Sequence, residues 1–276
     1  GLSKDTIRTI SEPRAAAIHY AAQQHIPAGS HVAVFDFGGG TLDIAVLRAE
    51  QNGDFSVVAA KGDNTLGGRT IDNVLYRWVL DQVEHNDPDT ADELKSAEVS
   101  VMHSLDQSIR EAKEMLSDTS SATITVSTPR GEHDFLITRD EFNTLIDKVV
   151  GRAVELTQAA LSQAGVDKST PIYMTGGSSR IPYVQNRLGE VGTVMTLDDP
   201  KTVVARGALA ATMMGFTEGS GQVTATKSQQ PNNPFGVGPG TVGAAQAASQ
   251  SQGQPQQGEA QGTPGTGQRP GQRRAS

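Results

Sequence analysis

Apolar side chains recur along residues 14–214 with two alternating periods, which predict strands and helices in turn. Residues 31–37 and 41–48 are rich in β-branched residues and flank three consecutive glycines, with apolar and polar positions alternating. This pattern predicts an antiparallel hairpin with a glycine turn. A third strand is expected at 55–61, and apolar residues spaced three and four apart predict a helix near 71–83.

The remaining pattern continues this alternation. One long helix is expected over 90–116, and another begins at Thr138, which has a glutamate three residues later, the spacing of a capping box. That helix should end near Ala164, before Gly165. The other expected elements are strands at 122–127, 132–137, 172–175 and 194–197 and helices at 14–24, 180–188 and 200–214. The class is therefore α/β, and the first hairpin favours a mixed sheet over an all-parallel one.

The composition changes abruptly after residue 216. Residues 217–276 contain 12 Gly, 6 Pro and 12 Gln, and these make up half of the segment. Such a segment has too few apolar side chains to offset the entropy lost on folding. We therefore expect residues 1–216 to fold and residues 217–276 to form a disordered tail.

The charge distribution disfavours a nucleic-acid partner. The whole chain carries a net charge of −8, while four basic and two acidic side chains give residues 217–276 a charge of +2, which leaves −10 on the rest. Phosphate backbones are bound by clustered Lys and Arg, so a body this acidic is a poor candidate for binding nucleic acid.

The cysteine content and the length of the apolar runs exclude two further kinds of feature, namely cysteine-based sites and membrane spans. The chain has no cysteine, which excludes disulfides and thiolate metal sites and is compatible with a reducing cytoplasm, the expected location. No run of about 18 apolar residues is present, so no membrane span is expected.

The strongest chemical signal is the segment from Asp36 to Asp43, which reads Asp-Phe-Gly-Gly-Gly-Thr-Leu-Asp. Glycines at a turn let backbone N–H groups approach an anion closely, because no Cβ stands in the way. Carboxylates beside such a turn would repel phosphate unless a divalent cation such as hydrated Mg²⁺ lay between them. A plain hairpin with a loose glycine turn is the alternative interpretation.

Two further glycine turns each follow a strand and precede a helix. Residues 62–68 end in Gly67 and Gly68, where backbone amides and the helix dipole would favour negative charge. Residues 175–182 contain another glycine pair and Arg180, whose guanidinium could stack on a planar base or pair with phosphate. A helix-entry turn and an ordinary surface arginine are the corresponding alternatives.

The order and spacing of these turns resemble the nucleotide-binding domain of the 70-kilodalton heat-shock chaperones of the DnaK type, within the actin and sugar-kinase superfamily. The resemblance runs from about residue 6 to residue 216. It implies an actin-like ATPase fold, related to ribonuclease H and here mostly its second lobe, with a capping subdomain at about 66–137. It also implies ATP or ADP with Mg²⁺ as cofactors, and a co-chaperone or nucleotide-exchange factor at the capping subdomain as a partner.

The resemblance assigns roles to individual residues. Glu12, Asp36 and Asp43 are the expected catalytic carboxylates, and Glu12 and Asp36 would hold Mg²⁺ through water. Residues 110–117 resemble the helix that contacts adenosine, with Lys113 and Ser117 at contact positions. The full set expected to bind nucleotide is Gly38, Gly39, Gly40, Thr41, Gly67, Gly68, Lys113, Ser117, Gly176, Gly177, Ser178 and Arg180.

Departures from the family pattern leave a second interpretation open. Arg69 and Arg110 replace acidic residues of the family, and Lys201 replaces an aspartate near the adenine. The family's first phosphate loop and catalytic lysine precede the segment that residues 10–17 resemble, and its peptide-binding domain follows the nucleotide-binding one. We therefore expect that the parent protein couples ATP hydrolysis to lobe closure, while this chain alone does not hydrolyse ATP. A non-catalytic actin-like scaffold is the alternative.

Overall fold

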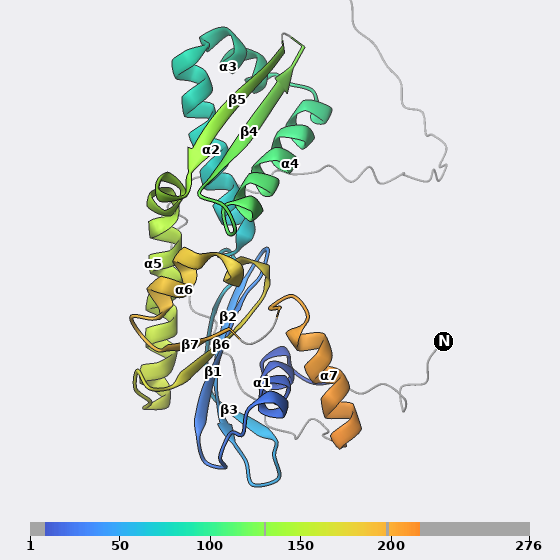
Figure 1. Cartoon of the computed structure of the whole chain (residues 1–276), viewed down its shortest axis with the longest axis vertical. Helices are drawn as coiled ribbons and strands as arrows, with labels where there is room; N and C mark the ends of the chain where they lie inside the picture. The colour runs from blue at the N-terminus through green and yellow to red at the C-terminus, as the bar shows by residue number, and fades with distance from the viewer. Residues whose placement is uncertain (1–8, 130, 197–198, 216–276) are drawn as a thin grey trace, which may run out of the picture. The chain divides into compact units, whose positions relative to one another are not determined.

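Five strands form the central sheet of the computed structural model, in the order β3-β2-β1-β6-β7 (Figure 1). β1 (His31–Phe37), β2 (Leu42–Ala49) and β3 (Phe55–Asp63) are an antiparallel meander, as the sequence predicts. β6 (Pro171–Thr175) runs parallel to β1, and β7 (Thr193–Met195) runs parallel to β6. The mixed sheet and the α/β class are therefore confirmed.

Helices cover both faces of this sheet. α1 (Glu12–Gln23) and α7 (Val203–Met214) pack against each other on one face, and α5 (Arg139–Ala164) covers the other (Figure 1). Along β1 the alternation of the strand decides which side chain faces which layer: Val32 and Val34 join the α1 and α7 core, while Phe35 joins the core under α5.

A second layered unit lies between β3 and α5 in the chain, and we call it the α2–β5 segment. It contains α2 (Gly68–Asn86), α3 (Pro88–Lys95), α4 (Val99–Met115) and a two-stranded sheet of β4 (Ser121–Thr128) and β5 (Gly131–Thr138). Apolar side chains of α2, α4 and β4 are buried together and continue into the core under α5. The hydrophobic layer is thus continuous from the central sheet into this segment.

The expectation of one helix over 90–116 is wrong. The chain forms α3 and α4 instead, separated at residues 96–98. The Ser96 hydroxyl donates to the carbonyls of Asp92 and Glu93, 3.3 and 3.2 Å away, and thereby competes with continuation of the helix. α3 also begins earlier than expected, because Asp87 caps it through the backbone N–H of Thr90.

Most other predicted ends agree closely. The Thr138 and Glu141 side chains form the expected capping box. α5 ends at Ala164 and is capped by Gly165, whose φ of 68° is the left-handed conformation that favours glycine. The helix expected over 180–188 is a short 3₁₀ turn, η2 (Gly177–Arg180), followed by α6 (Pro182–Leu188). α7 begins at Val203, three residues later than expected.

The structure describes residues 9–129, 131–196 and 199–215. The expected tail at 217–276 and the last residue of the strand expected at 194–197 lie outside these ranges. Within them, no helix combines the length and the apolar character needed to cross a membrane.

Candidate functional site

The three glycine turns come together at the end of β1. A Cβ on Gly67 would lie only 2.6 Å from the backbone carbonyl carbon of Gly40, and one on Gly176 would lie 2.5 Å from the carbonyl oxygen of Phe37. Gly176 also has a φ of 83°, which side-chain-bearing residues rarely adopt. Glycine is therefore required where the second and third turns touch the first.

Hydrogen bonds fix these turns to one another. The backbone N–H of Gly68 donates to the Gly38 carbonyl at 2.9 Å, and that of Arg69 donates to the Gly39 carbonyl at 2.8 Å. The Ser178 hydroxyl also donates to the Gly38 carbonyl, at 3.0 Å. The N–H groups of Gly68 and Arg69, at the start of α2, thus bind the first turn rather than pointing outward.

Two backbone donors of the first turn stay open. The N–H groups of Gly39 and Gly40 donate to no group in the part of the chain that the structure describes. Both residues are exposed, and a Cβ on either would meet nothing within 4 Å. Gly38 closes the turn by donating to the Thr41 carbonyl at 3.0 Å. The first turn therefore offers uncrowded N–H groups of the kind that cradle an oxyanion.

Carboxylates surround the base of this turn. Asp36 in β1 is directly opposite Asp43 in β2, and Glu12 begins α1. Burial, together with the smaller effects of the negative charges of Glu12 and Asp43, raises the pKa of Asp36 to about 6. Such a cluster gains stability from a cation that neutralises it.

The donor set suits a hydrated cation. Among the described residues, no group of three or more His, Asp or Glu side chains could hold a metal ion by itself. Asp36 and Glu12 can instead accept hydrogen bonds from the water shell that Mg²⁺ tends to keep. The residues therefore fit Mg²⁺ held through water, next to an anion on Gly39 and Gly40.

The α4 helix brings Lys113 to the second glycine turn. The Lys113 Nζ lies 2.6 Å from the Asp72 Oδ1, with both side chains largely buried. A Cβ on Gly68 would lie 2.8 Å from the Ser178 Oγ and 3.4 Å from the Lys113 Nζ. The Ser178 and Lys113 side chains therefore both lie next to Gly68. Ser117 follows one turn later, and its carbonyl accepts from the side chain of Arg139 at 3.3 Å.

Sequence reasoning missed Asp72 and Pro200. Asp72 follows Gly68 by one helical turn, and that i, i+4 spacing on α2 was the available signal. The Pro200 carbonyl accepts from the Thr175 hydroxyl at 3.1 Å and from the Gly176 N–H at 3.2 Å. Because every residue has a backbone carbonyl, the sequence carries no signal for this role. Arg180 ends η2 beside this turn, exposed to solvent, and forms no ion pair with another described residue.

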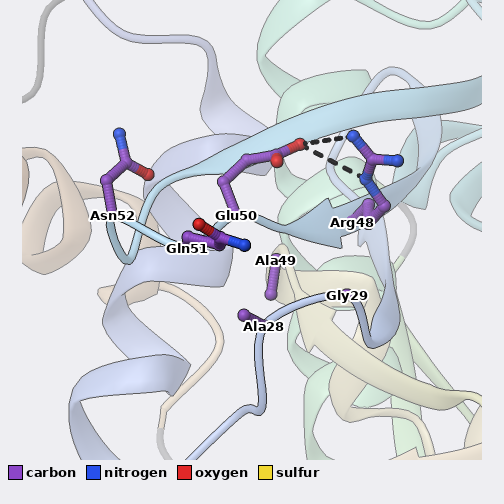
Figure 2. Close-up of a pocket in the computed structure, with 7 residues that line it drawn as sticks. All are labelled: Ala28, Gly29, Arg48, Ala49, Glu50, Gln51 and Asn52. Atoms are coloured by element: carbon purple, nitrogen blue, oxygen red, sulfur yellow. Dashed lines mark hydrogen bonds and ion pairs between the residues drawn. The ribbon is translucent and has the colours of Figure 1, made fainter.

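A surface hollow lies elsewhere, at the opposite ends of β1 and β2. Figure 2 shows it between Ala28, Gly29 and residues 48–52, with the Arg48 Nη2 and the Glu50 Oε1 joined at 3.1 Å. Its charged side chains neutralise each other; Arg48 is exposed and Glu50 is half-buried. Among the described residues, the backbone donors and carboxylates that could bind a ligand together therefore lie at the glycine turns.

Comparison with known proteins gives a consistent assignment. The family model described as Hsp70 protein matches residues 1–226. Chaperone protein HscA of Shigella boydii serotype 18 and that of Escherichia coli O9:H4 are each 39% identical over 209 residues, which cover 73% of this chain and 31% of the relative. The HscA of Enterobacter sp. strain 638 is 38% identical over the same length. The chain thus spans about a third of the length of these curated relatives.

Proposed function

Since this chain belongs to the Hsp70 family, we propose that its three glycine turns bind ATP or ADP together with Mg²⁺. One observation carries the proposal: the first turn presents the open N–H groups of Gly39 and Gly40 beside the carboxylate of Asp36. Donors for phosphate and an acidic neighbour that favours a cation lie together, as a metal–nucleotide complex requires.

Each part of the site has a task in this proposal. Gly39 and Gly40, with Thr41, hold phosphate oxygens, and Asp36 and Glu12 order the water around the metal. Mg²⁺ would neutralise phosphate charge, which is the chemistry that phosphoryl transfer depends on. Because bound Mg²⁺ favours the ionised carboxylate, it would return the pKa of Asp36 toward its ordinary value.

The nucleoside belongs, in this proposal, on the α4 side of the glycine turns. Lys113, Ser117 and Ser178 offer polar groups there, and Arg180 has a guanidinium plane that can stack on a base. We assign residues 1–216 to the nucleotide-binding domain and residues 66–137 to its capping subdomain, which contains nearly all of the α2–β5 segment.

The whole protein would act as a chaperone ATPase in which the binding and hydrolysis of Mg²⁺–ATP are coupled to lobe closure. Its HscA relatives are named as chaperones. A co-chaperone or nucleotide-exchange factor at the capping subdomain is the partner that we propose for this cycle.

A second candidate is a non-catalytic actin-like scaffold. The observation that favours it is that the N–H groups of Gly68 and Arg69 already donate to Gly38 and Gly39. These two N–H groups are then not available to phosphate in this conformation, and Arg69 and Arg110 stand where the family has acidic residues.

Calorimetric titration of the 276-residue chain with ADP and ATP, with and without Mg²⁺, separates the two candidates. Micromolar binding that needs Mg²⁺ and is lost in Asp36→Ala supports nucleotide binding. Asp81→Ala, at an exposed position on α2, is the matched control and should bind like the parent. A folded parent chain that binds neither nucleotide overturns the proposal and favours the scaffold.

A further inference from the structure

The loop between β2 and β3 contains the one Asn-Gly pair of the chain, Asn52 and Gly53. Both residues are exposed, and Gly53 has a φ of 83°, a conformation that side-chain-bearing residues rarely adopt. Figure 2 shows Asn52 on this loop, apart from the Arg48 and Glu50 side chains. Because glycine has no Cβ, its backbone nitrogen can approach the side-chain carbonyl carbon of the preceding asparagine closely.

The side-chain amide of Asn52 is held in a defined orientation. The Asp54 N–H donates to the Asn52 Oδ1 at 3.0 Å, and this hydrogen bond polarises the side-chain carbonyl. When a nucleophile attacks Cγ, negative charge develops on the same oxygen, and a donor that is already in place stabilises it. Among the described residues, none accepts a hydrogen bond from the Asn52 Nδ2. The amide nitrogen is therefore free to leave.

The backbone nitrogen of Gly53 lies in a closed loop. The Gly53 N–H donates to the Glu50 carbonyl at 3.1 Å, and the Glu50 N–H donates to the Asp54 carbonyl at 2.8 Å. A reaction at the Gly53 nitrogen gives up the first of these hydrogen bonds and keeps the second. The lost bond is at the surface, where water replaces it at little cost.

We propose that Asn52 is a modification site at which this loop converts the asparagine, without an enzyme, into aspartate or isoaspartate. The Gly53 nitrogen gives its proton to the solvent and forms a bond to the Asn52 Cγ, while the Cγ–Nδ2 bond breaks and Nδ2 leaves as ammonia. Water then opens the cyclic imide. Attack at Cγ gives aspartate, and attack at the backbone carbonyl carbon gives isoaspartate, in which the chain continues through the former side chain.

The modification changes the hollow that Figure 2 shows. Arg48 and Glu50 neutralise each other there, so a carboxylate at position 52 makes its rim negative. The new charge also lies two residues before Asp54, whose carboxylate binds the Arg14 guanidinium of α1 at 2.7 and 2.9 Å. Isoaspartate lengthens the backbone of the loop and displaces Asp54 from this ion pair. The site therefore affects both the surface charge and a contact with α1.

Peptide mapping of the folded full chain, incubated in mildly alkaline water enriched in oxygen-18, tests the proposal. Trypsin cleaves after Arg48 and Lys61. The resulting peptide, residues 49–61, contains Asn52 as its only asparagine. We expect this peptide to gain one heavy oxygen and to separate into two products of equal mass, aspartate and isoaspartate. Digestion in ordinary water leaves any later conversion unlabelled.

The free peptide 49–61 shows what the folded loop contributes. Because the Asp54 N–H is already placed on the Asn52 Oδ1, the folded chain should react at least as fast as the free peptide. Conversion of the free peptide with no conversion of the folded chain would overturn the proposal.

Asn64 is the matched control in the same digest. It is also exposed in a turn, but the β-branched Thr65 follows it, and the Thr65 N–H donates to the Asp63 Oδ1 at 2.9 Å. The tryptic peptide of residues 62–69, which contains Asn64 as its only asparagine, should remain unlabelled. Equal labelling of the two peptides would mean that exposure alone controls the reaction, and would overturn the role of the Asn-Gly loop.

Two variants locate the reaction within the peptide 49–61. Asn52→Gln keeps an amide but moves its carbonyl carbon one bond further from the Gly53 nitrogen, so labelling should fall about tenfold or more. Unchanged labelling would place the reaction at Gln51 and overturn the proposal. Asn52→Asp supplies the aspartate product and should elute with one of the two labelled species; a labelled parent peptide without that species would exclude the imide as the intermediate.

Discussion

Around the central sheet, backbones touch one another directly, whereas in the α2–β5 segment the elements meet through large side chains. Gly67 touches Gly40, and Gly176 touches Phe37, at distances that exclude a Cβ. The core of the α2–β5 segment is instead made of side chains such as Leu75, Leu105 and Ile124. Backbone contact fixes atomic positions more narrowly than side-chain packing, which can adjust by rotamer changes. A site that must hold a charged ligand in fixed geometry belongs in the first region.

The largest effect should come from the crossing of α1 and α7. A Cβ on Gly207 would overlap the carbonyl oxygen of Ala15, so Gly207→Ala must push the two helices apart. We expect a loss of about 3 kcal/mol or more in the free energy of unfolding, measured with urea.

The matched control for that substitution is Gly151→Ala in α5. A Cβ there meets nothing within 4 Å, and alanine favours a helix by about 1 kcal/mol over glycine. Gly151→Ala should therefore leave stability unchanged or raise it. If Gly207→Ala and Gly151→Ala lost equal free energy of unfolding, the close backbone contact between α1 and α7 would not be what stabilises the fold there.

The second effect should come from the contact between the first two glycine turns. Gly67→Ala should cost about 1–3 kcal/mol, because the new Cβ would meet the backbone of Gly40. It should also abolish Mg²⁺–ADP binding in the calorimeter. Gly39→Ala, where a Cβ meets nothing, should keep the stability of the parent within about 0.5 kcal/mol; a larger loss there would show that the first turn is crowded in solution.

The third effect concerns charge rather than shape. The pKa of Asp36 is raised to about 6 in the folded state, so the folded state binds its proton more tightly than the unfolded state. Asp36 therefore lowers the free energy of unfolding as pH rises from about 4 to 6. This loss of stability is complete above about pH 6. Asp36→Asn should therefore stabilise the ligand-free chain by about 1–2 kcal/mol at pH 7.5, after allowance for solvent screening.

Urea unfolding at several pH values measures this difference. The gain from Asp36→Asn should shrink as pH falls below about 6 and vanish below about pH 3, where the carboxyl is protonated in both states. Asp81→Asn should show no such trend. A gain independent of pH would mean that the carboxylate charge is not what destabilises the site.

The smallest effect should be at the surface of the α2–β5 segment. Leu136 in β5 is 64% exposed, so Leu136→Thr removes little buried area and keeps a residue suited to a strand. The free energy of unfolding should change by no more than about 0.5 kcal/mol. A loss above 2 kcal/mol would show that another part of the chain covers this face.

The elements that the sequence predicted well are those with local signals. Alternation across 31–48 predicted the hairpin, and the Thr138 and Glu141 pair with Gly165 predicted both ends of α5. The helix expected over 90–116 failed because its apolar spacing continues through residues 96–98, while the Ser96 hydroxyl bonds back to the preceding turn. Periodicity reports which face is apolar, and it does not report where a side chain interrupts the helix.

For the site, the sequence by itself determined which groups are present, namely three glycine turns and the carboxylates beside the first. It also determined the family that these groups resemble. Only the tertiary structure decided which groups are available. It uses the N–H groups of Gly68 and Arg69 internally, leaves those of Gly39 and Gly40 open, and pairs Lys113 with Asp72, 41 positions away. Local propensities act over a few residues, whereas these hydrogen bonds join segments up to 140 positions apart, and their partners are chosen only when the chain folds.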